Sequence, residues 1–213
     1  MVEMYQHQSM WNVYQHPPIH QIYTEVYGTE RIWVYPDRVN MKPPLHPDHP
    51  DWDHKGMYHW DVNTSKLPVR FGTQGVLFLT HTADNQGSFI CWPRAHKSLI
   101  NKESPWVPEI SLGDFIQVPA KVGSLLIWHI ALPHAKRTNT SNSPRLAQYR
   151  NYYPVPDPMD EERRQERITL WQARRALGRG AYPGEPRGWE AKNYGSAELT
   201  PLGRKLLGLD CWD

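Results

Sequence analysis

Short extended segments separated by turns fill the middle of the chain and limit the folds open to it. Residues 57–153 are rich in β-branched and aromatic residues and carry no long helical period. Residues 83–87 supply the Asn and Gly that a tight hairpin turn needs where φ is positive. The pattern predicts strands at residues 57–62, 74–81, 88–92, 115–118, 124–131 and 145–153. Short strands at this spacing predict two sheets packed face to face, as in a sandwich or jelly roll.

The N-terminal part of the chain is expected to be helical and then extended. Residues 9–27 have apolar residues at helical spacing, but Pro17 and Pro18 split the segment into two short helices. Residues 30–40 have the composition of a strand. Residues 43–54 contain four prolines and therefore predict an irregular, solvated loop over the core.

The C-terminal part changes character after Pro158. Residues 160–177 carry a weak apolar stripe among Glu, Arg and Gln, which predicts a helix. A loop is expected next, and a short helix should follow Thr200 with Pro201 in its first turn. We therefore expect three parts: an N-terminal helical segment at 1–29, a β core at 30–156, and a C-terminal helix and tail at 157–213 that pack on the core.

Charge and composition narrow the choice of partners. Lys and Arg total 24 and Asp and Glu total 22, and a net charge of +2 predicts no nucleic-acid partner. No apolar stretch approaches the roughly 20 residues of a membrane span, and the first ten residues lack the blocks of a secretory signal. Cys91 and Cys211 cannot form a disulfide framework and are expected to be small buried groups. A cytoplasmic protein is expected.

The triplet His59-Trp60-Asp61 is the strongest local signal for chemistry. In a strand, His59 and Asp61 project to one face, so that an imidazole and a carboxylate reach the same ion. His134 follows the predicted strand 124–131 at a Leu-Pro break and is the best candidate for a third ligand. Two His and one carboxylate form the facial triad of non-haem Fe(II) oxygenases. The alternative is a triplet that occurs by chance.

Arg145 follows His134 by eleven residues, at the start of the last predicted strand. A guanidinium binds a carboxylate through two parallel hydrogen bonds, as Lys cannot, which suits a cosubstrate with a distal carboxylate. The alternative is a surface arginine.

These residues form part of an ordered set that resembles the phytanoyl-CoA dioxygenase family and is similar to ectoine hydroxylase over the same blocks. The resemblance runs from about Arg38 to Tyr153, and the joint pattern is far more specific than any one motif. The blocks are Arg38-Val39-Asn40-Met41-Lys42-Pro43, His59-Trp60-Asp61, Asp84-Asn85-Gln86-Gly87, Pro93-Arg94-Ala95-His96-Lys97-Ser98, Gly123-Ser124-Leu125-Leu126-Ile127-Trp128-His129, and Pro133-His134 with Arg145.

The resemblance implies a double-stranded β-helix (jelly roll, cupin-like) with flanking α-helices, an Fe(II) ion, and 2-oxoglutarate as cosubstrate. By it, the metal ligands are His59, Asp61 and His134, and Arg145 pairs with the far carboxylate of 2-oxoglutarate. Asn40 falls where the family places an amide near the cosubstrate. Gln74 is a further candidate for cosubstrate contact, against the alternative of an ordinary polar strand residue.

The expected activity is hydroxylation of an unactivated C–H bond of a small organic metabolite, with O₂ consumed and succinate and CO₂ released. Two other classes stay open. One is a cupin-like hydrolase or isomerase that uses the same three ligands without 2-oxoglutarate, which leaves Arg145 unexplained. The other is a non-catalytic jelly-roll binding module with structural histidines, which leaves the ordered set of blocks a coincidence.

Two charges beside the distal histidine depart from the family pattern. Lys136 stands where relatives often have a small hydroxyl residue, and Arg137 follows it. We hypothesise that both bind an anionic group of the substrate, against the alternative of solvated loop charges. His129, in the preceding strand, is expected to be packed or hydrogen-bonded rather than a ligand.

Overall fold

The computed structural model describes residues 2–53, 58–64, 66–97, 115–177 and 187–212. It divides the chain into two compact units. One unit joins residues 1–39 to residues 149–213, and the other comprises residues 40–148. The three-part division expected from the sequence stays a proposal.

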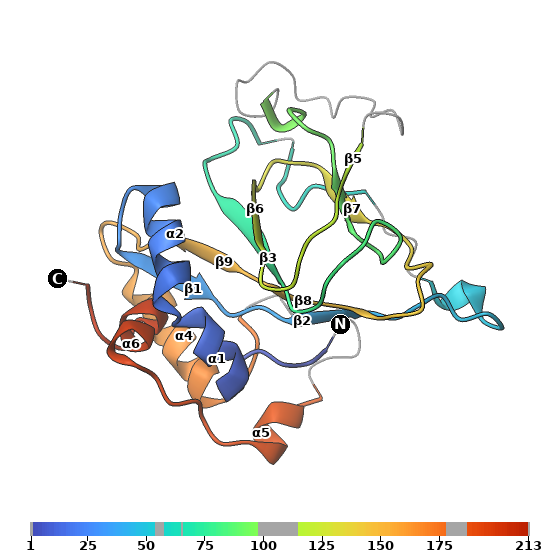
Figure 1. Cartoon of the computed structure of the whole chain (residues 1–213). Helices are drawn as coiled ribbons and strands as arrows, with labels where there is room; N and C mark the ends of the chain where they lie inside the picture. The colour runs from blue at the N-terminus through green and yellow to red at the C-terminus, as the bar shows by residue number, and fades with distance from the viewer. Residues whose placement is uncertain (1, 54–57, 65, 98–114, 178–186, 213) are drawn as a thin grey trace. The chain divides into compact units, whose positions relative to one another are not determined.

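The first unit is built from helices around a two-stranded ribbon (Figure 1). Its helices are α1 (Gln8–Tyr14), α2 (Pro17–Tyr27), α4 (Glu161–Gln172), α5 (Trp189–Asn193) and α6 (Pro201–Leu207), and β1 (Ile32–Tyr35) pairs antiparallel with β9 (Asn151–Pro154). The expected split of the N-terminal helix is confirmed, because Pro17 begins α2 directly after His16. Helix α2 contacts β9, and α6 contacts β1.

The C-terminal helices partly match expectation. Asp160 caps α4 through the backbone N–H of Arg163 at 2.9 Å, and Thr200 caps α6. Helix α4 ends at Gln172 rather than at Leu177, and Arg174 takes a φ of 54° just beyond it. Helix α5 was expected to be loop. None of the helices within the described ranges is long and apolar enough to cross a bilayer.

The second unit contains two antiparallel sheets. The larger has the order β2-β8-β3-β6, with bounds β2 (Val39–Lys42), β8 (Arg145–Tyr149), β3 (Thr73–Phe78) and β6 (Leu125–His129). The smaller has the order β5-β4-β7, with bounds β5 (Ile116–Val118), β4 (Phe89–Cys91) and β7 (His134–Lys136). Phe89 of β4 contacts Trp128 of β6, with ring centroids 4.6 Å apart, so the two sheets face each other. The prediction of a mainly β, jelly-roll fold with flanking helices is confirmed, and among the described residues the sheets do not close into a barrel.

The predicted strand at residues 57–62 is wrong for the described part of that segment. His59 makes only an isolated bridge to His134, with N–H to carbonyl distances of 3.2 Å in both directions. Residue 57 lies outside the described residues. The ladder does not continue past this pair, because the next N–H that could donate across it, that of Leu132, bonds the His129 carbonyl at 2.8 Å instead. Trp60 packs against Val69 and Ala131 in a small apolar cluster.

The turn at residues 83–87 is present, but it does not close a hairpin. Gln86 donates its N–H to the Ala83 carbonyl at 3.0 Å, and Gly87 has a φ of 66°. Strands β3 and β4 on either side belong to different sheets, so the turn carries the chain from one sheet to the other. The long strand predicted at 145–153 is interrupted at Arg150, which separates β8 from β9. Cys91 is buried as expected, whereas Cys211 is exposed.

Candidate metal centre

Three side chains expected to bind metal lie together at the start of β7. One ligand atom from each of His59, Asp61 and His134 lies within 4.8 Å of the others. The Nε2 atom of His59 is 3.6 Å from Asp61 Oδ1, and the Nε2 atom of His134 is 3.5 Å from Asp61 Oδ2. The isolated bridge between His59 and His134 brings these separate segments together. Two imidazoles and a carboxylate thus offer three donor atoms around one point.

The surroundings of His134 favour the neutral imidazole, which is the form that can act as a metal ligand. Its Nδ1 atom lies 3.0 Å from the Leu132 carbonyl, which can only accept, so Nδ1 carries the hydrogen and Nε2 carries the lone pair. Burial, the largest influence, lowers the pKa of His134 below its ordinary value. The neutral imidazole with Nε2 directed at Asp61 is the form that a metal binds.

Asp61 is more exposed than His134 and is held by an amide. The side chain of Asp61 is 41% exposed, whereas that of His134 is 10% exposed. Gln74 of β3 donates its Nε2–H to Asp61 Oδ2 at 2.5 Å. Gln74 also accepts a hydrogen bond of 3.0 Å from Trp128 Nε1. Its side chain therefore contacts a candidate metal ligand directly.

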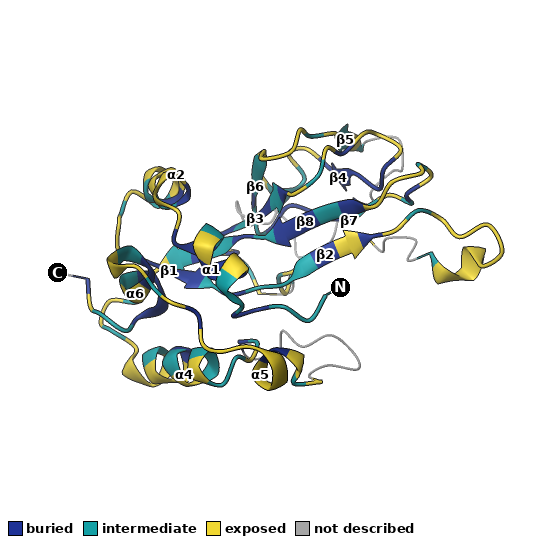
Figure 2. Ribbon diagram, turned by 60° about the horizontal axis from the view of Figure 1, so that its bottom comes forward, coloured by how far each residue is buried: buried dark blue, intermediate teal, exposed yellow. Residues whose placement is uncertain are grey.

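Arg145 lies deep in the same sheet. It is the first residue of β8, as expected, and is 2% exposed. Figure 2 shows that most of β8 is buried. Its Nη1 donates to Asn40 Oδ1 of β2 at 3.2 Å, and its guanidinium carbon lies 5.4 Å from the centroid of the Phe78 ring on β3. The alternative of a surface arginine is wrong.

The positions on β3 relate this guanidinium to the three candidate ligands. Gln74 and Phe78 are four residues apart on one strand, so their side chains project to the same face, about 13 Å apart along it. Gln74 contacts Asp61, and Phe78 contacts Arg145. The candidate metal ligands and the buried cation therefore lie along the inner face of one sheet.

The loop at residues 43–53 is not solvated throughout. Asp53 Oδ1 lies 2.6 Å from Lys42 Nζ, and the side chains of Lys42 and Asp53 are only 8% and 7% exposed. Thr138 donates its hydroxyl to Asp53 Oδ2 at 2.5 Å. The expectation of a solvated loop is wrong at Asp53, because this ion pair fastens the end of the loop to β2. Residue 54 lies outside the described residues.

Two cations, Lys136 and Arg137, follow the candidate ligand His134 in the chain. Lys136 shares the inner face of β7 with His134, because residues two apart on a strand project together. Arg137 is exposed and donates to Gln117 Oε1 at 3.2 Å. Arg137 lies beyond the end of β7, and a joint contact of Lys136 and Arg137 with an anionic group of the substrate stays a prediction.

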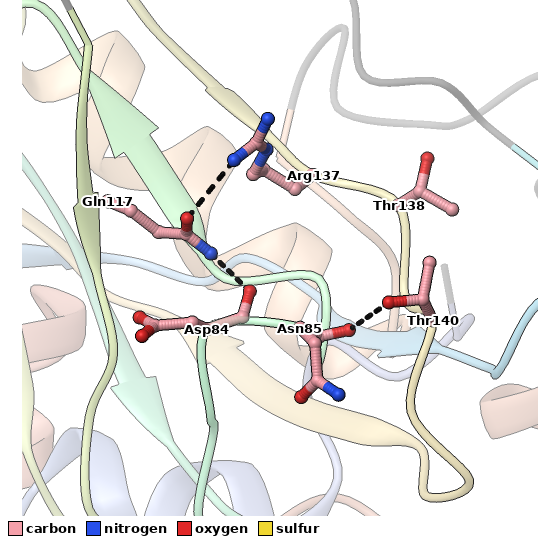
Figure 3. Close-up of a pocket in the computed structure, with 6 residues that line it drawn as sticks. All are labelled: Asp84, Asn85, Gln117, Arg137, Thr138 and Thr140. Atoms are coloured by element: carbon pink, nitrogen blue, oxygen red, sulfur yellow. Dashed lines mark hydrogen bonds between the residues drawn. The ribbon is translucent and has the colours of Figure 1, made fainter.

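A separate pocket of about 420 Å³ lies beside Arg137 and contains none of the candidate ligands (Figure 3). Figure 3 shows Gln117 between Arg137 and the carbonyl of Asp84, to which its amide donates. Pockets for small organic ligands are mostly apolar with a few placed polar groups, whereas every residue that lines this pocket is polar. The lining residues are Asp84, Asn85, Gln117, Arg137, Thr138 and Thr140.

The fold and the gathered groups define a jelly-roll protein with two imidazoles and one carboxylate at a candidate metal centre. The family model described as phytanoyl-CoA dioxygenase (PhyH) matches residues 8–147, which are 140 of the 213 residues. The chain belongs to this family, whose enzymes use Fe(II) and 2-oxoglutarate. The matched range includes His59, Asp61, His134 and Arg145. No curated protein sequence matches the chain significantly.

Solved structures share the fold at low identity. GlcNAc Inducible Gene 2 (GIG2, DUF1479) from Candida albicans aligns with a TM-score of 0.71 and 12% identity over 100% of this chain and 66% of its own. The non-heme alpha ketoglutarate dependent epimerase SnoN from nogalamycin biosynthesis aligns with a TM-score of 0.56 and 16% identity, over 91% of this chain and 71% of its own. The non-heme monooxygenase ThoJ in its apo form aligns with a TM-score of 0.53 and 16% identity, over 66% of this chain and 53% of its own. The chain thus spans about half the length of ThoJ, and these likenesses concern the fold alone.

Sequence reasoning missed two contacts near the candidate ligands. Gln74 was expected near the cosubstrate, and its contact with Asp61 was not foreseen. The hydrogen bond from Trp128 to Gln74 depends on the pairing of β3 with β6. Alternating side-chain direction places both residues on strand faces, but only the register shows that they are opposite each other.

Proposed function

We propose that the chain is an Fe(II)- and 2-oxoglutarate-dependent oxygenase that hydroxylates an unactivated C–H bond of a small organic metabolite. The proposal rests above all on the gathering of His59, Asp61 and His134 within 4.8 Å. Membership of the phytanoyl-CoA dioxygenase family supports the same reaction class. When bound, iron and 2-oxoglutarate supply the oxidising chemistry, in which O₂ is consumed and succinate and CO₂ are released.

The residues present fit this metal. His59 and His134 each direct Nε2 at Asp61, and the Leu132 carbonyl selects the required tautomer of His134. Two His and one carboxylate on one side of an iron ion leave positions for the cosubstrate and O₂. In this proposal, these three side chains hold the iron.

Arg145 suits the distal carboxylate of 2-oxoglutarate. Its guanidinium is buried, stays charged at neutral pH, and has the fork geometry that pairs with a carboxylate. Asn40 orients the fork by accepting from Nη1. Phe78 covers one face of the guanidinium and strengthens its electrostatic interactions by excluding water.

Hydroxylation is the outcome that we propose among those that this cofactor chemistry permits. The proteins of similar fold include a monooxygenase and an epimerase, so the fold is compatible with more than one outcome. The product of turnover should carry one additional oxygen atom derived from O₂. Mass spectrometry of reactions in labelled O₂ measures this directly.

The decisive experiment is an anaerobic titration of the purified chain with Fe(II) and then 2-oxoglutarate. We expect a weak visible charge-transfer band that appears only with both additions. Asp61→Ala and His134→Ala should remove the band while the circular dichroism spectrum stays native. A folded chain that binds iron without the band would favour the cupin-like hydrolase or isomerase. A chain that binds neither addition would favour the binding module.

A turnover screen then addresses the substrate. Succinate release is followed over panels of small metabolites, with Asp61→Ala as the inactive control. A substrate raises succinate formation above the slow decarboxylation seen without it. Equal succinate formation with every compound tested, and no oxidised product, would contradict the hydroxylase proposal.

A further inference from the structure

Gln74 and Trp128 form a fixed pair on the inner face of the larger sheet. They are directly opposite each other in the antiparallel pairing of β3 and β6, and opposite residues project to the same face. Trp128 Nε1 lies 3.0 Å from Gln74 Oε1. An indole N–H can only donate, so the amide oxygen of Gln74 must be the atom that faces Trp128.

This orientation determines what Gln74 offers to Asp61. With its oxygen facing the indole, Gln74 presents its NH₂ group to Asp61 Oδ2 at 2.5 Å. The reversed amide would place an oxygen against the carboxylate and a nitrogen against the indole N–H, with repulsion at both contacts. The Trp128 indole therefore determines that Gln74 presents a hydrogen-bond donor to the Asp61 carboxylate.

Asp61 depends on such a contact more than the histidines do. The side chains of Asp61 and His59 are both 41% exposed, but Asp61 lies in a bend outside any strand, whereas His59 is bridged to His134. Backbone pairing places His59 and His134, whereas the carboxylate plane of Asp61 is oriented by the amide of Gln74. A short hydrogen bond to an ionised carboxylate is among the stronger ones in proteins.

Trp128 also contacts the other side of the centre. Its ring centroid lies 5.2 Å from that of His134 and 4.6 Å from that of Phe89. Trp128 is 8% exposed, so packing restricts its indole. One rigid side chain thus packs against one candidate ligand and, through Gln74, orients another.

We propose that Gln74 and Trp128 are positioning residues that hold the Asp61 carboxylate in the geometry required for metal binding, with Trp128 acting through Gln74. This inference rests on the proposed function, because it assumes that Asp61 binds the metal. Groups that orient metal ligands typically contribute about 10–100-fold to metal affinity. The same inference explains why Gln74 faces Asp61 although the sequence suggested a contact with the cosubstrate.

The test uses Co(II) as a spectroscopic probe and Fe(II) with 2-oxoglutarate under anaerobic conditions. Gln74→Leu should weaken Co(II) binding about 10–100-fold and shift the Co(II) visible spectrum, because the carboxylate loses its donor. Trp128→Phe keeps an aromatic ring against His134 but removes the N–H, so it should weaken binding by a smaller factor. Gln117→Leu, at an amide of β5 away from the ligands, is the matched control and should bind Co(II) as the wild type does.

The double variant tests whether the two residues act in series. If Trp128 acts on Asp61 through Gln74, then Gln74→Leu with Trp128→Phe should bind Co(II) no more weakly than Gln74→Leu alone. Additive losses would overturn the serial arrangement. Native circular dichroism and unchanged urea midpoints establish that each variant is folded, and Trp128→Phe alone still tests the idea if Gln74→Leu does not fold.

Failure of this inference is distinguishable from failure of the proposed function. A wild type that binds Fe(II) and 2-oxoglutarate with the charge-transfer band, together with a folded Gln74→Leu variant of unchanged affinity and spectrum, overturns only the positioning role. A wild type without metal affinity or band overturns the proposed function, and the positioning role with it.

Discussion

His134 Nδ1 lies 3.0 Å from the carbonyl oxygen of Leu132, two residues before it in the chain. This local contact selects the tautomer that leaves Nε2 available beside Asp61. The backbone of His134 is meanwhile bridged to His59 on one side and paired with Cys91 of β4 on the other. A single short strand therefore fixes the position, the tautomer and the neighbour of one candidate ligand.

Loss of the Arg145 guanidinium should weaken the binding of 2-oxoglutarate. Hydrogen bonds to charged groups contribute roughly 1.5–3 kcal/mol, so Arg145→Gln should raise the half-saturating 2-oxoglutarate concentration by about 10–100-fold. Arg145→Lys keeps the positive charge but loses the fork geometry, so its half-saturating 2-oxoglutarate concentration should lie between those of the wild type and Arg145→Gln. The measurement is titration of the anaerobic Fe(II) protein, with exposed Arg137→Gln as the control. An unchanged half-saturating concentration in Arg145→Gln would contradict the assigned role.

Spacing and residue type predict which residues form the candidate site, and the roles of those residues stay predictions. His59, Asp61, His134 and Arg145 were identified from such signals, and the structure brings the first three together. The strand at residues 57–62 was predicted wrongly because alternation cannot show that the Leu132 N–H bonds the His129 carbonyl rather than a neighbouring strand. The orientation of Asp61 by Gln74 depends on the register between β3 and β6, which are far apart in the sequence. Local patterns contain no information about such a register.

The ion pair of Lys42 and Asp53 should be important for stability in the second unit. Both side chains are more than nine-tenths buried, and their charged atoms are 2.6 Å apart. Removal of one partner from a buried pair leaves an uncompensated charge and typically costs about 3–5 kcal/mol. Asp53→Ala should therefore lower the free energy of unfolding by about 3 kcal/mol, measured by urea denaturation.

The double replacement of this pair supplies the control. Lys42→Met with Asp53→Leu removes both charges together. The free energy of unfolding of this double variant should be much closer to that of the wild type than that of Asp53→Ala is. A double variant as unstable as Asp53→Ala would show that volume or the contact with Thr138, rather than charge, determines the loss.

Replacement of two fully buried arginines in the first unit, Arg150 and Arg167, should change the free energy of unfolding by different amounts. Arg167 donates to the carbonyls of Val34, Leu206 and Leu207 and to the Tyr153 hydroxyl. The guanidinium of Arg150 instead lies over the Tyr14 ring at 4.4 Å and donates to no backbone carbonyl among the described residues. Burial lowers the pKa of both arginines.

Arg167→Met should therefore lower the free energy of unfolding by about 3 kcal/mol or more, because several carbonyls lose their donor. Arg150→Met removes a buried charge that makes no such bonds and should change the free energy of unfolding by less than about 1 kcal/mol, or increase it. Urea denaturation of the two variants side by side tests the contrast. Equal losses would contradict the idea that hydrogen bonding separates the two sites.

Acid should destabilise the metal-free chain in part through His129. Its Nδ1 accepts the Ala131 N–H at 3.0 Å, and its ring lies 5.6 Å from that of His96. Burial is the largest influence that lowers the pKa of His129, and the charge of His96 lowers it further. Burial also lowers the pKa of His96, ahead of the charge of Lys97. Both imidazoles therefore bind protons more weakly in the folded chain than in the unfolded chain.

The sign of the pH dependence follows from that difference. The unfolded chain, with histidine pKa values near the ordinary value of about 6.5, takes up protons first as the pH falls, so the free energy of unfolding decreases below that pH. Stability is complete above about pH 6.5 and is lost as the pH falls through the lowered pKa values of the folded chain. His129→Asn retains an acceptor for Ala131 but does not titrate, so its stability should vary less with pH. Urea denaturation from pH 7.5 to 5.5 in the presence of a chelator measures the slope, and His16→Asn at an exposed position should keep the wild-type slope. Identical slopes in His129→Asn and the wild type would mean that other groups account for the loss of stability in acid.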